Sequence, residues 1–446
     1  MSERAARWAF SLALVATAAL VAAPWRGHAD DVDAQVYLVL ARHLAADRAW
    51  FDLRYLPDVW PVFREHLPFG LWPAAAAIRF GGEWAVGPVY AAITLGTVAL
   101  AGAIATALGG RWAGVAASLL LGTCESIWQY GGRPLFDPPL LFFATAAAGA
   151  VLLPRPRFVL AGGCAAAAVL IKGPFGLVPL ISCVAARALI GRSPRFFAGG
   201  AAASVGATLP AAAFLLWDRW AGAGTWWNGY FQAQLAASAA GTRSDGIAAW
   251  WFPLAVVAGR FWPGMALVPL AVWRARRDRG LRVLAVASAL SLALLTLPHR
   301  KWGNHAYVVF PLLAVLCGVA AAPWAERLLT RRGALYALAG AALAAWVASL
   351  AGAGRWVLQP PCVVSSEFAR DLDAVPAGSP VLVVSSRLEE PTIAELAAER
   401  GYLPRPASAL PDRADPPAAL ARDEIPVPPA WRVVARARGW SLLLAR

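Results

Sequence analysis

The chain has 446 residues, of which 59% are hydrophobic and only 15% are charged. Soluble globular domains carry about 25% charged residues, so this composition excludes an ordinary water-soluble enzyme. The formal net charge of +14 would suit a nucleic-acid-binding protein, but the arginines lie in short links between long apolar runs, which excludes that class and indicates a multi-pass membrane protein.

Eleven apolar segments predict membrane-spanning helices, since a span needs about 20 apolar residues. Their alanine and glycine content suits helices that pack closely in lipid. In chain order the predicted spans cover 8–24, 86–108, 113–130, 137–153, 157–171, 174–190, 197–217, 250–273, 281–297, 305–322 and 333–352. The fifth and sixth spans are short and flank Lys172-Gly173-Pro174, so their bounds are approximate.

The basic residues lie in alternate links, which predicts the orientation of the chain. One set of links holds sixteen arginines and three acidic residues, whereas the first loop on the other side, 25–85, holds six arginines and eight acidic residues. Because basic links stay in the cytoplasm, we expect a cytoplasmic N-terminus and a periplasmic 25–85 loop in a bacterial inner membrane protein. The same alternation puts on the outer side Asp137, Lys172, the 218–249 loop, residues 299–305 and the tail after 353.

The first outer loop contains an apolar segment, 67–80, that must stay on the outer side for this alternation to hold. It is predicted to be an interfacial helix that lies on the membrane. The span at 8–24 follows a short basic stretch, so a cleavable signal peptide is an alternative to a membrane anchor. We favour a retained anchor, because its removal would leave the outer loop untethered on its N-terminal side.

The composition changes from about residue 355 to proline, arginine and acidic residues, which predicts a domain boundary there. Residues 1–354 are expected to form the transmembrane domain and 355–446 a small periplasmic α/β domain. Its predicted elements are strands at 381–384, 431–436 and 441–444, a short helix at 392–400, and an irregular proline-rich link at 404–429.

Ionisable residues at the outer ends of spans are the candidates for chemistry, because charge at membrane depth is costly. Asp33 and Tyr37 share one face of a predicted helix in the first loop. Asp137 begins a predicted span and precedes two prolines. Each aspartate also has a structural interpretation as a helix cap, since its carboxylate can accept hydrogen bonds from free backbone N–H groups.

The lysines form a second pattern. Of 40 basic residues only Lys172 and Lys301 are lysines, and both lie at predicted outer ends of spans. A compact ammonium suits a phosphate group. Glu65 and His66, with His305, are ligand types that suit a divalent cation such as Zn²⁺, although a solvated loop is the alternative.

Taken in order, these residues resemble the bacterial relatives of protein O-mannosyltransferases and of the lipid A aminoarabinose transferase, in the GT-C glycosyltransferase superfamily. The matching positions are Asp33 and Tyr37, Arg42, Trp50, Glu65 with Pro68 and Trp72, Asp137-Pro138, Leu170 to Pro174, and Lys301 with Tyr307 and Pro311. The chain departs from the family motifs at Ala34, His66 and Leu67, which replace Glu, Lys and Pro, and the 218–249 loop lacks the family's Glu-His and Arg-Phe.

The resemblance implies a GT-C fold and transfer of a sugar from a polyprenyl-phosphate donor to a lipid, glycan or protein acceptor in the periplasm. It implies Asp33 as the base that takes the acceptor proton, and Asp137 as a second carboxylate. The candidate phosphate ligands are Lys172, Lys301 and Arg42. Substrate contacts are assigned to Tyr37, Glu65, His66, Tyr307 and His305, with anchoring at the membrane interface as the alternative for Tyr37. The resemblance assigns no definite cofactor, and a divalent cation on Glu65, His66 and His305 stays an open alternative.

Two other classes of function compete with this interpretation. A transporter or lipid flippase would need charges or broken helices near the middle of the membrane, and Arg260 is the main residue that fits this description. A catalytically inactive assembly protein would explain why Ala34 replaces the expected acid.

Overall fold

The computed structural model describes residues 2–25, 32–56, 61–191, 193–242, 246–350, 368–373, 375–385, 392–393, 396–397, 401–413, 416–437 and 439–445. The chain forms two compact units. The first, the helical unit, holds Met1–Arg26, Arg64–Pro73 and Trp84–Gly354. The second unit holds Gly27–Phe63, Ala74–Glu83 and Arg355–Arg446.

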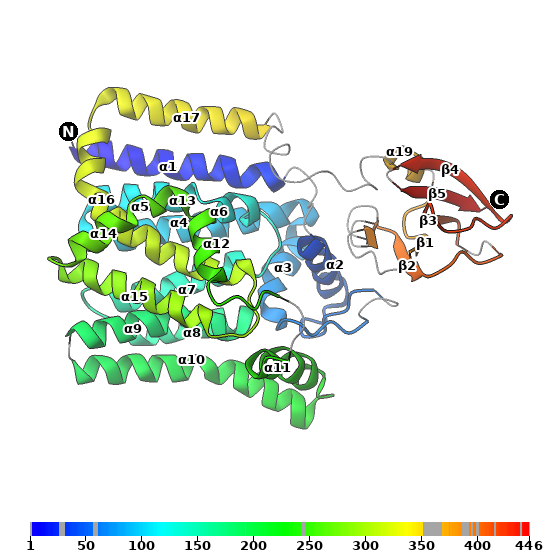
Figure 1. Cartoon of the computed structure of the whole chain (residues 1–446), viewed down its shortest axis with the longest axis horizontal. Coiled ribbons are helices and arrows are strands. Elements are labelled where there is room, and N and C mark those ends of the chain that lie inside the picture. The colour runs from blue at the N-terminus through cyan, green and yellow to red at the C-terminus, as the bar shows by residue number, and fades with distance from the viewer. Residues whose placement is uncertain are drawn as a thin grey trace. The chain divides into compact units, whose positions relative to one another are not determined.

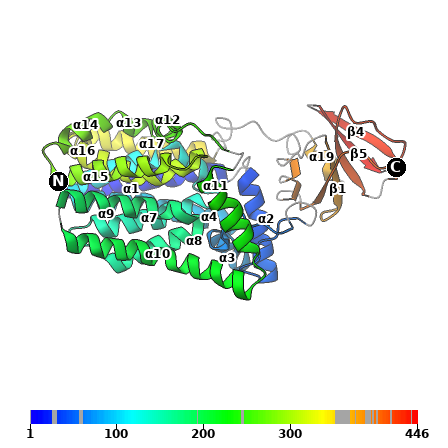
Figure 2. The same ribbon diagram turned by 60° about the horizontal axis from the view of Figure 1, so that its bottom comes forward.

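The helical unit is a bundle whose helices lie alongside one another (Figures 1 and 2). Its elements are α1 (Ser2–Trp25), η1 (Pro68–Leu71), α4 (Val86–Gly109), α5 (Arg111–Gly122), α6 (Glu125–Tyr130), α7 (Asp137–Leu152), α8 (Phe158–Lys172), η3 (Gly173–Leu177), α9 (Val178–Gly191) and α10 (Pro194–Ala221). They continue with the π-helix η4 (Trp227–Ala236), α11 (Ala237–Ala240), α12 (Phe252–Arg260), α13 (Trp262–Met265), α14 (Val268–Ala275), α15 (Arg279–Thr296), η5 (Gly303–Val309), α16 (Phe310–Leu329) and α17 (Arg332–Leu350).

Each predicted span coincides with a helix or with consecutive short helices. The segment 113–130 is divided into α5 and α6, and 250–273 is broken into α12, α13 and α14. Six helical stretches within the described residues are long and apolar enough to cross a membrane. They are Glu3–Val21, Glu83–Gly109, Phe158–Gly191, Pro194–Ala221, Arg279–Thr296 and Gly303–Leu329. The predicted all-α, multi-pass membrane fold is confirmed, and the number of eleven spans stays a prediction.

The longest of these stretches, Phe158–Gly191, folds back on itself. Arg187 on α9 donates hydrogen bonds to the carbonyl groups of Val151 and Leu153, the latter at 2.9 Å. These carbonyls end α7 just before α8 begins, so the far end of α9 lies beside the start of α8. The two short predicted spans at 157–171 and 174–190 are therefore the two arms of a hairpin.

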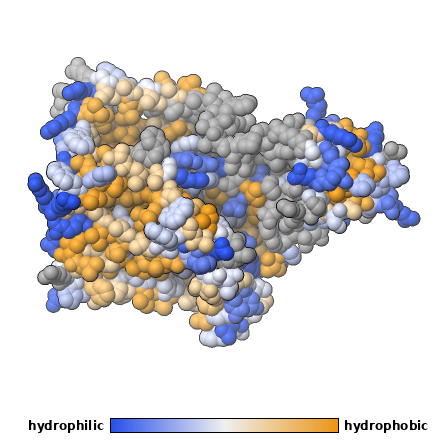
Figure 3. Space-filling view, in the orientation of Figure 1, coloured by the Kyte–Doolittle hydropathy of each residue, from blue (hydrophilic) through white to orange (hydrophobic). Residues whose placement is uncertain are grey.

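Arginines gather at one end of the helical unit, here called the arginine-rich end, which holds Arg111, Arg155, Arg187, Arg274 and Arg327. The N-terminus of α1 and the links from α9 to α10, from α14 to α15 and from α16 to α17 lie at this end, at the left of Figure 1. Figure 3 shows hydrophilic residues at this end beside an apolar belt over the helices. Several of these arginines are bound to the backbone: Arg187 and Arg274 each donate to main-chain carbonyl groups.

Small residues allow the helices to approach closely. A Cβ atom at Gly318 on α16 would lie 2.7 Å from the backbone nitrogen of Ala117 on α5. Glycine at this position therefore brings two backbones into contact, as is usual between helices in lipid.

The second unit contains α2 (Val32–Asp47), most of α3 (Trp72–Gly81) and a five-stranded sheet. The strands are β1 (Pro380–Val384), β2 (Leu403–Ala407), β3 (Ala418–Arg422), β4 (Trp431–Ala437) and β5 (Trp440–Ala445), in the order β2-β1-β3-β5-β4. Strand β1 pairs in parallel with β2 and β3, and the remaining pairs are antiparallel. Trp431 lies at the centre of the core on one face, and its indole N–H donates to the Pro411 carbonyl at 2.9 Å. A short helix, α19 (Ala369–Leu372), precedes the sheet.

The predicted strands at 381–384, 431–436 and 441–444 are confirmed. The prediction of an irregular link at 404–429 was wrong, because this segment contains β2 and β3. Strand β2 tolerates its two prolines because it is an edge strand, where alternate residues need no N–H partner. Strand β3 was missed because alanine is a poor strand former, yet here it is buried in the middle of the sheet.

Two further predicted helices have different outcomes. The predicted interfacial helix at 67–80 forms η1 followed by α3, while its place on the membrane stays a prediction. Of the predicted helix at 392–400, the described residues 392–393 and 396–397 are helical, and the rest lies outside the described residues.

Candidate active site

The centre of the candidate site is a buried ion pair between two helix ends. The Lys172 ammonium donates to Oδ1 of Asp137 at 2.8 Å, and the residues are 7% and 6% exposed. Asp137 opens α7, where the two following prolines need no N–H partner, and Lys172 closes α8. A carboxylate at a helix N-terminus and a cation at a C-terminus both oppose the charge of the helix dipole. The pair is thus stabilised by its helices, and each charge is neutralised by the other.

The turn after Lys172 requires glycine for two reasons. Gly173 has a φ of 64°, in the left-handed region that residues with a side chain rarely adopt. A Cβ atom there would also lie 2.2 Å from the hydroxyl oxygen of Tyr230. Pro174 then starts η3, so the Lys-Gly-Pro sequence ends one helix and begins the next element.

The short helix η5 joins the other candidate residues to this ion pair, because it packs against α7, α12 and η3. The His305 ring lies against Phe175 of η3, with centroids 3.8 Å apart. Tyr307 stacks on Tyr130 of α6 with ring centroids 5.8 Å apart.

Arg260, at the end of α12, lies beside the stacked tyrosines. Its Nη1 donates to the Tyr130 hydroxyl at 3.2 Å and to the Tyr307 hydroxyl. The sequence indicated Arg260 only as an exceptional charge within a span, and it gave no reason to select Tyr130. The signal for Tyr130 is its position at the end of a predicted span, directly before Gly131-Gly132.

Lys301 lies nearby in sequence but has a different environment. Its backbone pairs with Ile247, and its side chain is buried, with the residue 3% exposed. The ammonium makes a long contact of 3.4 Å with the His299 carbonyl and has no carboxylate partner among the described residues. Burial lowers the pKa of Lys301, because a charged amine loses solvation there.

Glu65 and His66 precede η1, which is fixed close to the ion pair. The Tyr90 hydroxyl donates to the Gly70 carbonyl at 3.2 Å. A Cβ atom at Gly70 would lie 2.0 Å from the Phe136 ring, so η1 packs without a gap against the residue before Asp137. The His66 ring lies 4.6 Å from Phe136, centroid to centroid. His66 and His305 both pack on aromatic rings, and within the described residues no three His, Cys, Asp or Glu side chains gather as a metal site.

The remaining candidates, Asp33, Tyr37 and Arg42, lie on α2 in the second unit. Asp33 is in the first turn of the helix and is exposed. Tyr37 is buried and packs edge-on against Phe63. Arg42 binds Glu83 through two hydrogen bonds, and its Nη2 lies 2.7 Å from Oε2. The structure thus joins Asp137, Lys172, Tyr307, His305 and His66 within the helical unit, whereas a meeting of Asp33 with them stays a prediction.

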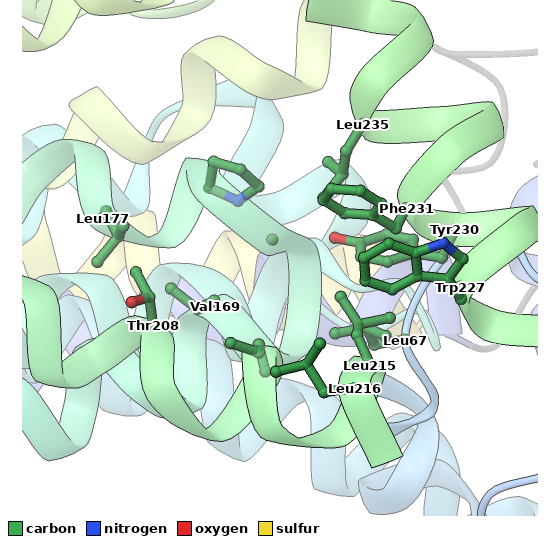
Figure 4. A pocket seen from close by; sticks show the side chains of 14 residues that line it. Leu67, Val169, Leu177, Thr208, Leu215, Leu216, Trp227, Tyr230, Phe231 and Leu235 are labelled. Atoms are coloured by element: carbon green, nitrogen blue, oxygen red, sulfur yellow. The ribbon is translucent and has the colours of Figure 1, made fainter. Parts of the chain in front are cut away.

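An apolar cavity of about 310 Å³ begins beside Gly173 and Pro174 and extends between α10 and η4 (Figure 4). Fourteen residues line it: Leu67, Val169, Gly173, Pro174, Leu177, Thr208, Ala211, Ala212, Leu215, Leu216, Trp227, Tyr230, Phe231 and Leu235. Figure 4 shows the aromatic side chains of Trp227, Tyr230 and Phe231 together on the η4 side.

The π-helix η4 is fixed over this cavity by the end of α10. The buried Asp218 carboxylate accepts a hydrogen bond from the Trp227 backbone N–H at 2.9 Å. The Arg219 guanidinium lies 4.5 Å from the centroid of the Trp227 ring. The π-helix η4 within the 218–249 loop thus forms one wall of the cavity.

No protein-family model matches the chain, and no curated protein sequence matches it. Solved structures do resemble it. One is ArnT from Cupriavidus metallidurans bound to undecaprenyl phosphate, with a TM-score of 0.73, 16% identity, and coverage of 98% of this chain and 97% of ArnT. The apo state of the same ArnT gives a TM-score of 0.65, with 16% identity and coverage of 92% and 93%.

A more distant similarity connects the chain to a second group of enzymes. The oligosaccharyltransferase of Archaeoglobus fulgidus has a TM-score of 0.53 and 15% identity, with coverage of 89% of this chain and 64% of that protein. ArnT and the oligosaccharyltransferase are both GT-C glycosyltransferases, so the fold expected from the motifs is confirmed. The chain has the fold of the GT-C glycosyltransferases, and the resemblance to ArnT covers nearly its whole length.

Proposed function

We propose that the protein is a glycosyltransferase that moves a sugar from a polyprenyl-phosphate carrier to an acceptor at the periplasmic face of the inner membrane. The observation that carries the proposal is the near full-length similarity to ArnT, whose crystal structure contains undecaprenyl phosphate. The buried Asp137–Lys172 pair beside an apolar cavity supports it independently, because a lipid-linked donor needs both a polar reaction centre and a place for its hydrocarbon chain.

The orientation follows from the two ends of the helical unit. Arginines concentrate at the arginine-rich end, and the positive-inside rule assigns that end to the cytoplasm. The opposite end, here called the site end, holds Asp137, Lys172, Arg260, Lys301 and Tyr307. A site end that faces the periplasm agrees with a donor that is presented on the outer leaflet.

The cavity of Figure 4 suits the donor's polyprenyl chain. Its walls are leucine, alanine, valine and aromatic side chains, which favour a branched hydrocarbon through burial of apolar surface. Because the cavity begins at Gly173, a donor whose polyprenyl chain is bound in the cavity would have its phosphate near the end of α8. Lys301, which has no described carboxylate partner, is well suited to oppose the phosphate charge.

The transfer itself requires a proton acceptor and a stabilised leaving group. The acceptor's hydroxyl or amine attacks the anomeric carbon, the bond from that carbon to the phosphate oxygen breaks, and the electron pair leaves with the polyprenyl phosphate. We assign the acceptor's proton to Asp33, an exposed carboxylate, and the orientation of the acceptor to Asp137. Tyr37, Glu65, His66, His305 and Tyr307 are assigned to substrate contact. In this scheme the main role of Lys172 is to neutralise Asp137, and direct binding of the phosphate by Lys172 is a secondary role.

The proposal is tested with membrane vesicles that contain the protein and a radiolabelled polyprenyl-phosphate sugar. We expect the label to appear covalently on an acceptor, and to disappear in Asp33→Asn vesicles that contain equal amounts of folded protein. If the label only crosses the bilayer and no acceptor is modified, the protein is a flippase.

The acceptor and the sugar need a separate experiment. Mass analysis of envelope glycolipids and glycoproteins from a deletion strain would identify the species that loses a sugar. Addition of EDTA to the vesicle assay would determine whether a divalent cation takes part.

A further inference from the structure

The starting observation is that the cations of the site end are not equivalent. Lys172 is neutralised by Asp137 at 2.8 Å. Arg260 forms no ion pair with any described residue, and its hydrogen bonds go to tyrosine hydroxyl groups. A half-buried guanidinium that no carboxylate binds directly is suited to bind an anion.

The second observation is that Arg260 is held in a fixed position by one of its nitrogens. Nη1 donates to the hydroxyl groups of both Tyr130 and Tyr307. The guanidinium carbon lies 5.9 Å and 5.8 Å from the centroids of these two rings, which stack on each other. The tyrosines therefore restrict the long side chain, so little conformational entropy remains to be lost when it binds a ligand.

The third observation concerns the donors that remain. The hydrogen bonds of Arg260 to described residues all come from Nη1, so the edge formed by Nε and Nη2 has no acceptor there. This edge of a guanidinium presents two parallel N–H groups, which match two oxygens of a phosphate group.

The fourth observation is the place of Arg260 relative to the ion pair. The hydroxyl group of Tyr307, on η5, accepts a hydrogen bond from Arg260. Helix α12, which ends at Arg260, packs against η5, and η5 packs against α7 and η3. A further guanidinium, that of the buried Arg133, lies 5.9 Å from the Tyr130 ring centroid and adds positive charge to this region.

We propose that Arg260 binds the phosphate of the polyprenyl donor through its Nε–Nη2 edge, and that Tyr130 and Tyr307 are positioning residues that hold it there. This inference rests on the proposed transferase function and names a second cation, in addition to Lys301, that stabilises its leaving group. As the bond between the anomeric carbon and the phosphate oxygen breaks, negative charge grows on the phosphate, and Arg260 stabilises that charge. The acceptor's proton goes to the carboxylate base, so Arg260 exchanges no proton.

The test measures binding of polyprenyl monophosphate, without sugar, to the purified full-length protein in detergent. We expect Arg260→Gln to weaken binding by about tenfold to a hundredfold, the usual effect of losing hydrogen bonds to a charged group. Arg260→Lys should recover part of the loss, because an ammonium keeps the charge but lacks the bidentate edge. Polyprenol, which has no phosphate, should bind the Arg260→Gln variant and the unmodified protein equally.

Arg274→Gln is the matched control. Arg274 is equally half-buried, belongs to the same broken segment, and lies 5.7 Å from the Trp324 ring centroid, but it donates to a backbone carbonyl. This variant should bind polyprenyl monophosphate normally. Tyr130→Phe should raise KM for the donor more than it lowers kcat, since Tyr130 acts on the donor only through the position of Arg260.

Each outcome separates the inference from the proposed function. Unchanged binding of polyprenyl monophosphate by a folded Arg260→Gln protein would overturn the inference. Arg260-dependent binding of a phosphorylated acceptor lipid, with donor binding unchanged, would overturn it by assigning Arg260 to the acceptor. If the unmodified protein binds polyprenyl monophosphate through Arg260 but transfers no sugar, the inference holds and the transferase proposal fails.

Discussion

The two ends of the helical unit use positive charge in opposite ways. At the arginine-rich end, Arg187 and Arg274 donate hydrogen bonds to backbone carbonyl groups of other helices or helix ends, so they stabilise the packing of the helices. At the site end, Lys172 binds a carboxylate and Arg260 binds phenol hydroxyls. We infer that the partner of a cation, more than its burial, separates a structural role from a chemical one.

The largest expected effect comes from breaking the ion pair at the site end. Asp137→Asn should lower kcat by on the order of a thousandfold, within the range for a lost catalytic carboxylate. Lys172→Met should also destabilise the protein by about 3–5 kcal/mol, because it leaves a buried carboxylate without its counter-charge. Initial transfer rates and thermal unfolding measure the two effects.

The double variant Asp137→Asn/Lys172→Met sharpens this prediction. It removes both buried charges, so it should regain most of the unfolding temperature lost in Lys172→Met while the transfer rate stays as low as in Asp137→Asn. Normal transfer by the double variant would show that the pair only supports the fold.

The next largest effect concerns the turn that carries Lys172. Gly173→Ala forces a side chain onto a left-handed residue and against the Tyr230 hydroxyl, so we expect a tenfold to hundredfold loss of transfer, on the order of 1–3 kcal/mol. Tyr230→Phe in the same protein should restore part of the activity, because it removes the clashing oxygen. Gly163→Ala on the same helix is the control, since no atom of the described residues, apart from the nearby backbone of its own helix, lies within 4 Å of its Cβ position. An unchanged rate in Gly173→Ala would mean that this turn does not position Lys172.

A smaller effect is expected from filling the apolar cavity. Ala211→Phe places a ring into the cavity, and KM for a long-chain donor should rise by about tenfold, equivalent to about 1.4 kcal/mol of lost burial. A donor with a short chain should be used as well as before. Val205→Phe on an exposed part of the same helix is the control. Equal effects on both donors would assign the cavity a structural role.

The smallest effect on catalysis is expected at the arginine-rich end. Arg187→Gln removes two hydrogen bonds to the carbonyls that end α7, which should cost about 1–3 kcal/mol of stability. The transfer rate per folded molecule should stay unchanged. A fall in kcat without a fall in unfolding temperature would contradict the contrast between the two ends.

The sequence predicted the helices well because apolar length and the position of arginines are strong local signals. It also selected Asp137 and Lys172, since charges at span ends are rare enough to be noticed. The sequence could not predict that Asp137 and Lys172 are in direct contact, because 35 positions separate them and only the packing of α7 on α8 brings them together.

Other features depend on contacts that no local pattern reveals. Strand β3 is alanine-rich and forms because neighbouring strands bury it. The 218–249 loop was predicted to lie on the outer side, but no local pattern predicted its π-helix at Trp227–Ala236, where the Asp218 carboxylate accepts a hydrogen bond from the Trp227 backbone N–H. Arg260 stood out as a charge within a span, whereas its two tyrosine partners come from segments 130 and 47 positions away.

The most direct test of the central claim is a single turnover of purified protein with a doubly labelled polyprenyl-phosphate sugar. The account predicts that one polyprenyl phosphate is released for each sugar that becomes attached to the acceptor, and that Asp137→Asn forms both products about a thousandfold more slowly. Release of free sugar without acceptor labelling, or full activity in Asp137→Asn, would contradict it.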